Sequence, residues 1–152
     1  MRRSRAVPYR GSEGFTLLEL MVALAVLSVG LLGVAVMQGV AIKALASGGM
    51  ITIANNLVRN AAERITKNSV NALSYASMNT GTGAKPNCPN IAPTPVCATD
   101  FTEWQTRVRQ LPQGLLQVGA AFGAAFATVT VTVTWQDAMG AHTVTLPLQV
   151  AP

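Results

Sequence analysis

The side chains that most often carry catalysis or bind metals are few in this sequence. His142 is the only histidine and there are two cysteines; behind the apolar N-terminal segment the acidic residues stand apart, at Glu63, Asp100, Glu103 and Asp137. A nucleophile with its base, or a metal site, needs several such groups close together. No spacing here is typical of one, although residues distant in sequence can converge in a fold. We therefore expect no enzymatic activity, no metal and no cofactor, and His142 as an exposed or packed strand residue.

Glu19 is the acidic residue whose position needs an explanation. It lies at the start of an apolar segment that begins at Phe15 and has no charged residue from Leu20 to Met37. A carboxylate costs about 2.5–3.5 kcal/mol at the middle of a bilayer and less near the interface. We interpret Glu19 as a charge with a functional role. The simpler alternative is a carboxylate that only reaches the lipid headgroups.

The apolar segment is long enough to span a membrane. It exceeds the roughly 7–15 apolar residues of a secretory signal peptide, and its Ala, Leu, Met and Val content favours helix. We predict helix from Phe15 to about Ala46 and a kink or soft joint at Ser47-Gly48-Gly49. An amphipathic helix then follows, whose apolar stripe consists of Ile51, Ala54, Val58, Ala61, Ile65 and Ala72. Its charges, Arg59, Glu63, Arg64 and Lys67, are predicted to face solvent.

The basic residues orient the chain and argue against nucleic-acid binding. The formal net charge is +5, but four of the eleven basic residues precede the apolar segment. Without residues 1–14, seven basic and five acidic residues remain, and no basic run interleaved with aromatics is left. Lysine and arginine are enriched on the cytoplasmic flank of a membrane span, so the C-terminal part should lie outside the cytoplasm. There Cys88 and Cys97 can form a disulfide, which would stabilise the loop at 79–98 by about 2–3 kcal/mol.

The C-terminal part is predicted to combine one short helix with a small antiparallel sheet. Asp100 is placed as the N-cap of a helix whose apolar side comprises Phe101, Trp104, Val108 and Leu111. Valine and threonine alternate strictly from Thr128 to Trp135, a turn is expected at 136–140, and the alternation returns from Val144 to Val150. Pro147 indicates an edge strand. Leu115–Val118 is a candidate third strand, and the doubled GAAF at 119–126 is predicted to be a pliable connection.

The run Gly14-Phe15-Thr16-Leu17-Leu18-Glu19 resembles the class III signal of type IV prepilins. A short basic leader precedes it and an apolar span follows, as in that family. The resemblance implies cleavage between Gly14 and Phe15 by prepilin peptidase and N-methylation of Phe15. It also implies that Glu19 pairs with an N-terminal ammonium, its own or that of an adjoining subunit.

The remaining sequence resembles V-type minor pilins, often described as type IV pilus modification proteins. The likeness rests on LSVGLLGVAVMQ at 27–38, NNLVRNAAERI at 55–65, the cysteine loop, DFTEWQTRVRQLPQG at 100–114 and VTVTVTWQD at 129–137. It implies an α+β pilin fold, with a long N-terminal helix packed on a small antiparallel sheet. The expected organisation is a leader (1–14), an apolar membrane and filament helix (15–50) and an extracytoplasmic head (51–152).

The leading hypothesis for function is a minor pilin that helps to initiate or modify a type IV pilus and supports motility and adhesion. Its expected partners are other minor and major pilins, the inner-membrane assembly machinery, prepilin peptidase and membrane lipid. It would reside in the bacterial inner membrane, with the head in the periplasm, and then in the pilus at the cell surface. The main alternative is a minor pseudopilin of a type II secretion system. An anchored enzyme and a ligand-binding adhesin are weaker alternatives.

Overall fold

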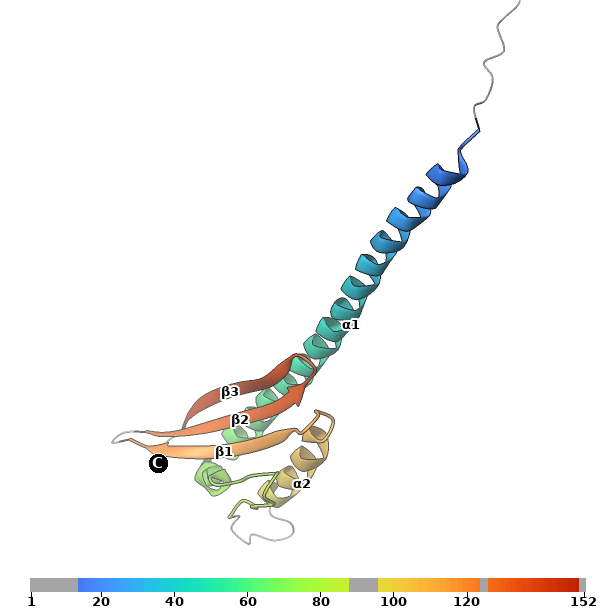
Figure 1. The fold of residues 1–152 in the computed structure, drawn as a ribbon. Helices are drawn as coiled ribbons and strands as arrows, with labels where there is room; N and C mark the ends of the chain where they lie inside the picture. The colour runs from blue at the N-terminus through green and yellow to red at the C-terminus, as the bar shows by residue number, and fades with distance from the viewer. Residues whose placement is uncertain (1–13, 88–95, 124–125, 151–152) are drawn as a thin grey trace, which may run out of the picture. The chain divides into compact units, whose positions relative to one another are not determined.

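The structure, a computed structural model, describes residues 14–87, 96–123 and 126–150 of the 152-residue chain. The chain divides into two units, residues 1–41 and 42–152. Within the described ranges the elements follow in the order α1 (Leu17–Lys67), η1 (Ser69–Tyr75), α2 (Val96–Val108), β1 (Leu115–Phe122), β2 (Ala127–Asp137) and β3 (Gly140–Val150) (Figure 1). This is the predicted α+β arrangement, a long N-terminal helix with a small antiparallel sheet.

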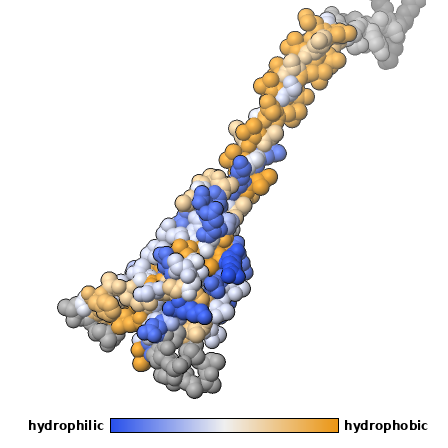
Figure 2. All heavy atoms as spheres, turned by 60° about the horizontal axis from the view of Figure 1, so that its bottom comes forward, coloured by the Kyte–Doolittle hydropathy of each residue, from blue (hydrophilic) through white to orange (hydrophobic). Residues whose placement is uncertain are grey.

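The first unit contains the N-terminal part of α1 and has an apolar surface. Its large apolar side chains are exposed, and Figure 2 shows them as a nearly continuous hydrophobic covering. The helix is long and apolar enough to cross a membrane. A helix satisfies its backbone hydrogen bonds internally, so it can present such side chains to lipid without exposing polar groups. The sequence prediction of an apolar helix is confirmed here.

The predicted joint at Ser47-Gly48-Gly49 is wrong, because α1 continues through it without interruption. Two interior glycines cost a helix about 2 kcal/mol relative to alanine. Ser47 is buried in the second unit, and the Thr52 hydroxyl donates to the Gly48 carbonyl at 3.1 Å. Burial at Ser47 and along the following turns outweighs the low helix propensity of the two glycines.

The C-terminal part of α1 contributes one face to the core of the second unit. Ala54, Val58, Ala61 and Ile65 are at most 2% exposed, as the predicted stripe requires. Ile51, which was assigned to the same stripe, is 41% exposed. The core cluster joins this helix face to residues of η1, α2 and the inner side of the sheet.

The sheet has the order β1-β2-β3 with antiparallel neighbours. Val129, Val131 and Val133 of the central strand are fully buried, and the alternating threonines lie on the outer face. β3 forms an edge, which confirms the inference from Pro147. Leu115–Val118 is indeed a strand, but β1 continues to Phe122, so the first GAAF is strand and not a pliable connection.

The connection between β2 and β3 is shorter than the turn predicted at 136–140. Asp137 pairs with Gly140, so only two residues join the strands. The backbone amide of Met139 donates to Oδ1 of Asp137 at 2.7 Å and closes the turn. Gly140 has φ +130°, a conformation that a side chain would strain. Strand pairing therefore extends further towards the turn than side-chain alternation alone indicates.

Helix α2 begins at Val96, four residues before the predicted start. The expected N-cap, Asp100, lies inside the helix and is almost completely buried. The prediction failed because aspartate is common at N-caps, whereas here its carboxylate binds partners on other elements.

Candidate functional site

The candidate processing site comprises Gly14, Phe15 and the first turn of α1. Gly14, Phe15 and Thr16 precede the helix, and the Phe15 side chain is exposed. The Glu19 backbone amide donates to the Thr16 hydroxyl at 3.2 Å, so Thr16 caps the helix start. A protease that binds its substrate in extended form would find the Gly14–Phe15 bond outside regular helix.

Glu19 occupies the third helical position, where a carboxylate is favourable. Unpaired backbone N–H groups give a helix N-terminus partial positive charge, worth about 0.3–1 kcal/mol to a nearby anion. We expected Phe15 and Glu19 to lie one helical turn apart. In the chain that retains residues 1–14, Phe15 instead precedes the helix. A contact between Phe15 and Glu19 would therefore join the first turn of the helix to the residue before the Thr16 cap.

Thr16 is a site residue that our sequence interpretation missed. Thr16 and Glu19 have the T-x-x-E spacing of a capping box, in which the two residues can satisfy each other's backbone amides. The hydrogen bond from Glu19 to Thr16 forms one half of that arrangement. The T-x-x-E spacing in the sequence is the signal that predicts this cap.

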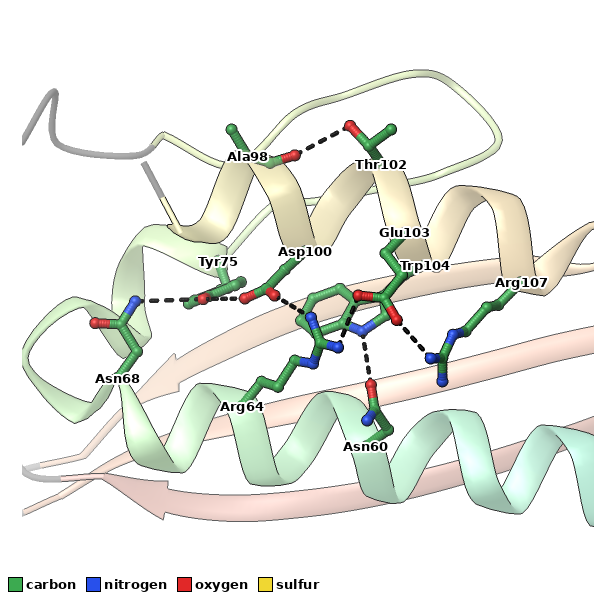
Figure 3. Close-up of polar contacts among 10 residues, drawn as sticks. All are labelled: Asn60, Arg64, Asn68, Tyr75, Ala98, Asp100, Thr102, Glu103, Trp104 and Arg107. Carbon is green, nitrogen blue, oxygen red and sulfur yellow. Dashed lines mark hydrogen bonds and ion pairs between the residues drawn. The ribbon is translucent and has the colours of Figure 1, made fainter. Parts of the chain in front are cut away.

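A polar network joins α1, η1 and α2 in the second unit (Figure 3). Arg64 donates from Nη1 to Oδ1 of Asp100 at 2.6 Å, and its Nη2 lies 2.7 Å from Oε2 of Glu103. The Tyr75 hydroxyl donates to Oδ2 of Asp100 at 2.7 Å. Arg64 therefore belongs to an ion-pair network and not to the solvated face predicted for it.

The protonation states of Arg64 and Tyr75 allow both side chains to donate hydrogen bonds to Asp100. The hydrogen bond to Asp100 raises the pKa of Arg64 above its ordinary value, although burial opposes the shift. Burial raises the pKa of the Tyr75 hydroxyl far above its ordinary value, so the hydroxyl stays protonated and can donate. Both partners of Asp100 thus remain donors at any physiological pH. Trp104 adds a further link between α2 and α1, since its Nε1 donates to Oδ1 of Asn60 at 3.2 Å.

A second polar cluster lies at the β2–β3 turn. His142 stacks on Trp135 with ring centroids 5.1 Å apart, and its Nε2 lies 3.0 Å from Oδ1 of Asp137. Desolvation raises the pKa of Asp137, but interactions with the Ser47 hydroxyl, the Met139 amide and His142 prevail and lower it to about 2. His142 is therefore a packed residue, as expected, and the sequence did not indicate its hydrogen-bond partner Asp137.

The two polar clusters lie on different elements. Asp137 ends β2 and His142 lies on β3, whereas Asp100 and Glu103 lie on α2. Among the described residues, the side-chain partner of His142 is Asp137. In the described residues no group of three histidine, cysteine, aspartate or glutamate side chains could hold a metal ion.

Only one of the two cysteines of the predicted disulfide lies in the described residues. Cys97 lies in the first turn of α2 and is buried. Cys88 lies outside the described residues, so the Cys88–Cys97 pairing stays a prediction. The network around Asp100 holds the helix that carries Cys97 and would therefore fix one end of the cysteine loop.

The chain has an N-terminal helix long and apolar enough to cross a membrane, and Gly14 and Phe15 lie just before it. Comparison with known families agrees, because residues 9–35 match the prokaryotic N-terminal methylation motif. This match supports a type IV pilin-like protein, whose class III signal implies processing by prepilin peptidase and assembly with pilin machinery in general. No significant match was found among curated proteins or solved structures.

Proposed function

We propose that the protein is a minor pilin of the V type, a non-enzymatic subunit that helps to initiate or modify a type IV pilus. After cleavage, the head would face the periplasm, and the subunit would then enter the filament and reach the cell surface. The observation that carries this proposal is Glu19, a carboxylate in the first turn of a helix whose N-terminal apolar side chains are exposed.

The charge of Glu19 gives the helix a means of selecting its position in a filament. An unpaired carboxylate or ammonium in an apolar environment costs several kcal/mol. Cleavage after Gly14 would create an ammonium group on Phe15, just before the Thr16 cap. A register that brings Glu19 to such an ammonium, in the same or an adjoining subunit, is therefore favoured over registers that leave either group alone.

The test compares wild type with Glu19→Ala in cells that produce filaments. Glu63→Ala is the matched control, because Glu63 is an exposed carboxylate on the same helix, within the second unit. We expect leader cleavage and membrane retention in all three proteins, since removing Glu19 lowers the cost of residing in lipid. Glu19→Ala alone should be lost from sheared filaments and from complexes with partner pilins.

Two outcomes would contradict this account. Normal incorporation of Glu19→Ala would show that its charge does not direct assembly, and loss of membrane retention would place the defect in anchoring. Co-purification of wild type with secretion components, and not with pili, would instead identify a type II pseudopilin.

A further inference from the structure

The β2–β3 turn lies beside α1, at the end of the second unit where this helix enters it (Figure 1). Asp137, the last residue of β2, interacts with the Ser47 hydroxyl. The second unit begins at Ile42, and at 1.5 Å per residue Ser47 is only about 8 Å further along the helix. The turn is therefore close to the point at which the chain passes into its apolar segment.

The charges that flank the apolar part of α1 indicate where a bilayer would end. The 23 residues 20–42 separate Glu19 from Lys43, and none of them is charged. As a helix they extend about 34 Å, compared with about 30 Å for the hydrocarbon core of a bilayer. Both charges then fall at the two interfaces. Ser47 follows Lys43 by about 6 Å, which is within the headgroup layer.

The two residues of the turn are apolar, although two-residue hairpin turns usually contain asparagine, aspartate or glycine. They are Ala138 and Met139, and Met139 is 54% exposed. The turn is closed by the backbone amide of Met139, which donates to Asp137. The Met139 side chain is thus free to leave water for an apolar medium, a transfer that is favourable.

The same end of the unit carries exposed basic side chains. The Gln136 amide donates to the Pro112 carbonyl at 3.0 Å, so the segment that follows α2, with Arg109, lies beside the end of β2. Lys43 and Arg109 are exposed, and neither forms an ion pair within the described part of the chain. The side chain of Asp137, the acidic residue at this end, is only 4% exposed. The surface around the turn is therefore positive and complementary to anionic lipid headgroups.

We propose that the β2–β3 turn is a second membrane contact of this chain. Met139 enters the interface of the bilayer that α1 spans, and Lys43 and Arg109 bind the phosphate groups of its anionic lipids. The same bilayer is the partner because the turn lies beside the helix that enters it, and because an apolar tip with a basic rim suits a lipid interface. The contact holds the head against the membrane for as long as α1 remains in lipid.

The test places a photoreactive benzophenone amino acid at single positions of the full, processed chain in vesicles of phosphatidylcholine and phosphatidylglycerol. Lipid adducts are then measured by mass spectrometry. Position 139 is compared with position 122, because Phe122 is also exposed and apolar but lies at the opposite end of β2, where it pairs with Ala127. Position 36, exposed in the apolar part of α1, reports insertion. We expect adducts at 139 and 36 and none at 122.

The basic side chains are tested in the protein labelled at position 139. Lys43→Gln and Arg109→Gln should each lower the adduct about fivefold, as the attraction of one basic residue to an anionic surface predicts. Lys67→Gln, which changes an exposed lysine at the other end of the unit's helix segment, is the matched control and should change nothing. Vesicles of phosphatidylcholine alone should abolish the difference between these variants.

Equal adducts at 139 and 122, or adducts at 36 alone, would overturn the proposed contact. Equal effects of Lys43→Gln, Arg109→Gln and Lys67→Gln would refute headgroup binding at this end. The contact requires anchoring by α1 but not a pilus. Filament entry without adducts at 139 would therefore refute the turn contact alone, whereas adducts at 139 in a protein that never enters pili would refute the proposed function alone.

Discussion

Asp100 should be the polar side chain on which the stability of the head depends most. Its side chain is 3% exposed and accepts two short hydrogen bonds, from Arg64 at 2.6 Å and Tyr75 at 2.7 Å. A hydrogen bond to a charged group contributes about 1.5–3 kcal/mol, and a donor left buried adds its desolvation cost. Asn in place of Asp100 keeps the volume and one acceptor oxygen but loses the charge.

We estimate that Asp100→Asn lowers the free energy of unfolding by about 2 kcal/mol and Asp100→Ala by about 3 kcal/mol. These values are below the sum of two charged hydrogen bonds, because the Arg64 side chain is 32% exposed and retains Glu103. For a head of this size, a loss of 2 kcal/mol corresponds to a melting temperature lower by about 10 °C.

The assay is urea and thermal unfolding of the full chain in detergent, followed by the fluorescence of Trp104 and Trp135. Glu103→Gln is the matched control, because this carboxylate is one third exposed and its ion pairs should contribute less than about 1 kcal/mol. Equal effects of Asp100→Asn and Glu103→Gln would refute the reasoning, since burial would then not determine the strength of the network.

Two further predictions concern the cysteine loop and the β2–β3 turn. Peptide mapping of protein isolated from membranes, without reduction, should find Cys88 joined to Cys97, and two alkylatable thiols would disprove the disulfide. Because the pKa of Asp137 is lowered to about 2 in the folded chain, its contribution to stability should be lost as the pH falls from about 4 to 2. Unfolding midpoints measured across this range should fall more steeply for wild type than for Asp137→Asn, and parallel curves would rule out the assignment.

The features predicted well from sequence were those for which a local pattern is compatible with a single kind of element. The valine and threonine alternation fixed the face of β2, and the uncharged stretch after Glu19 indicated a membrane helix. Pro147 indicated an edge strand because proline has no backbone N–H, so in a central strand it would leave one ladder hydrogen bond unmade. Each of these inferences depends on local chemistry alone.

The features that failed depend on contacts between distant residues. Asp100 looked like a helix cap, but Arg64, 36 positions away, and Tyr75 bind its carboxylate inside α2. Ser47-Gly48-Gly49 looked like a joint, but burial of Ser47 keeps the helix continuous. No pattern in the sequence marked Tyr75 as a donor to Asp100, whereas the pairing of Thr16 with Glu19 could have been found from its spacing.

The central claim, that this chain is a prepilin processed at the class III signal, is tested most directly by the mass of its N-terminus. Protein extracted from the membranes of its native cells should begin at Phe15 and carry a methyl group on the Phe15 amine. The chain would then lack the 14 residues of the leader. A chain that begins at Met1, or one cut beyond residue 30, would contradict the account.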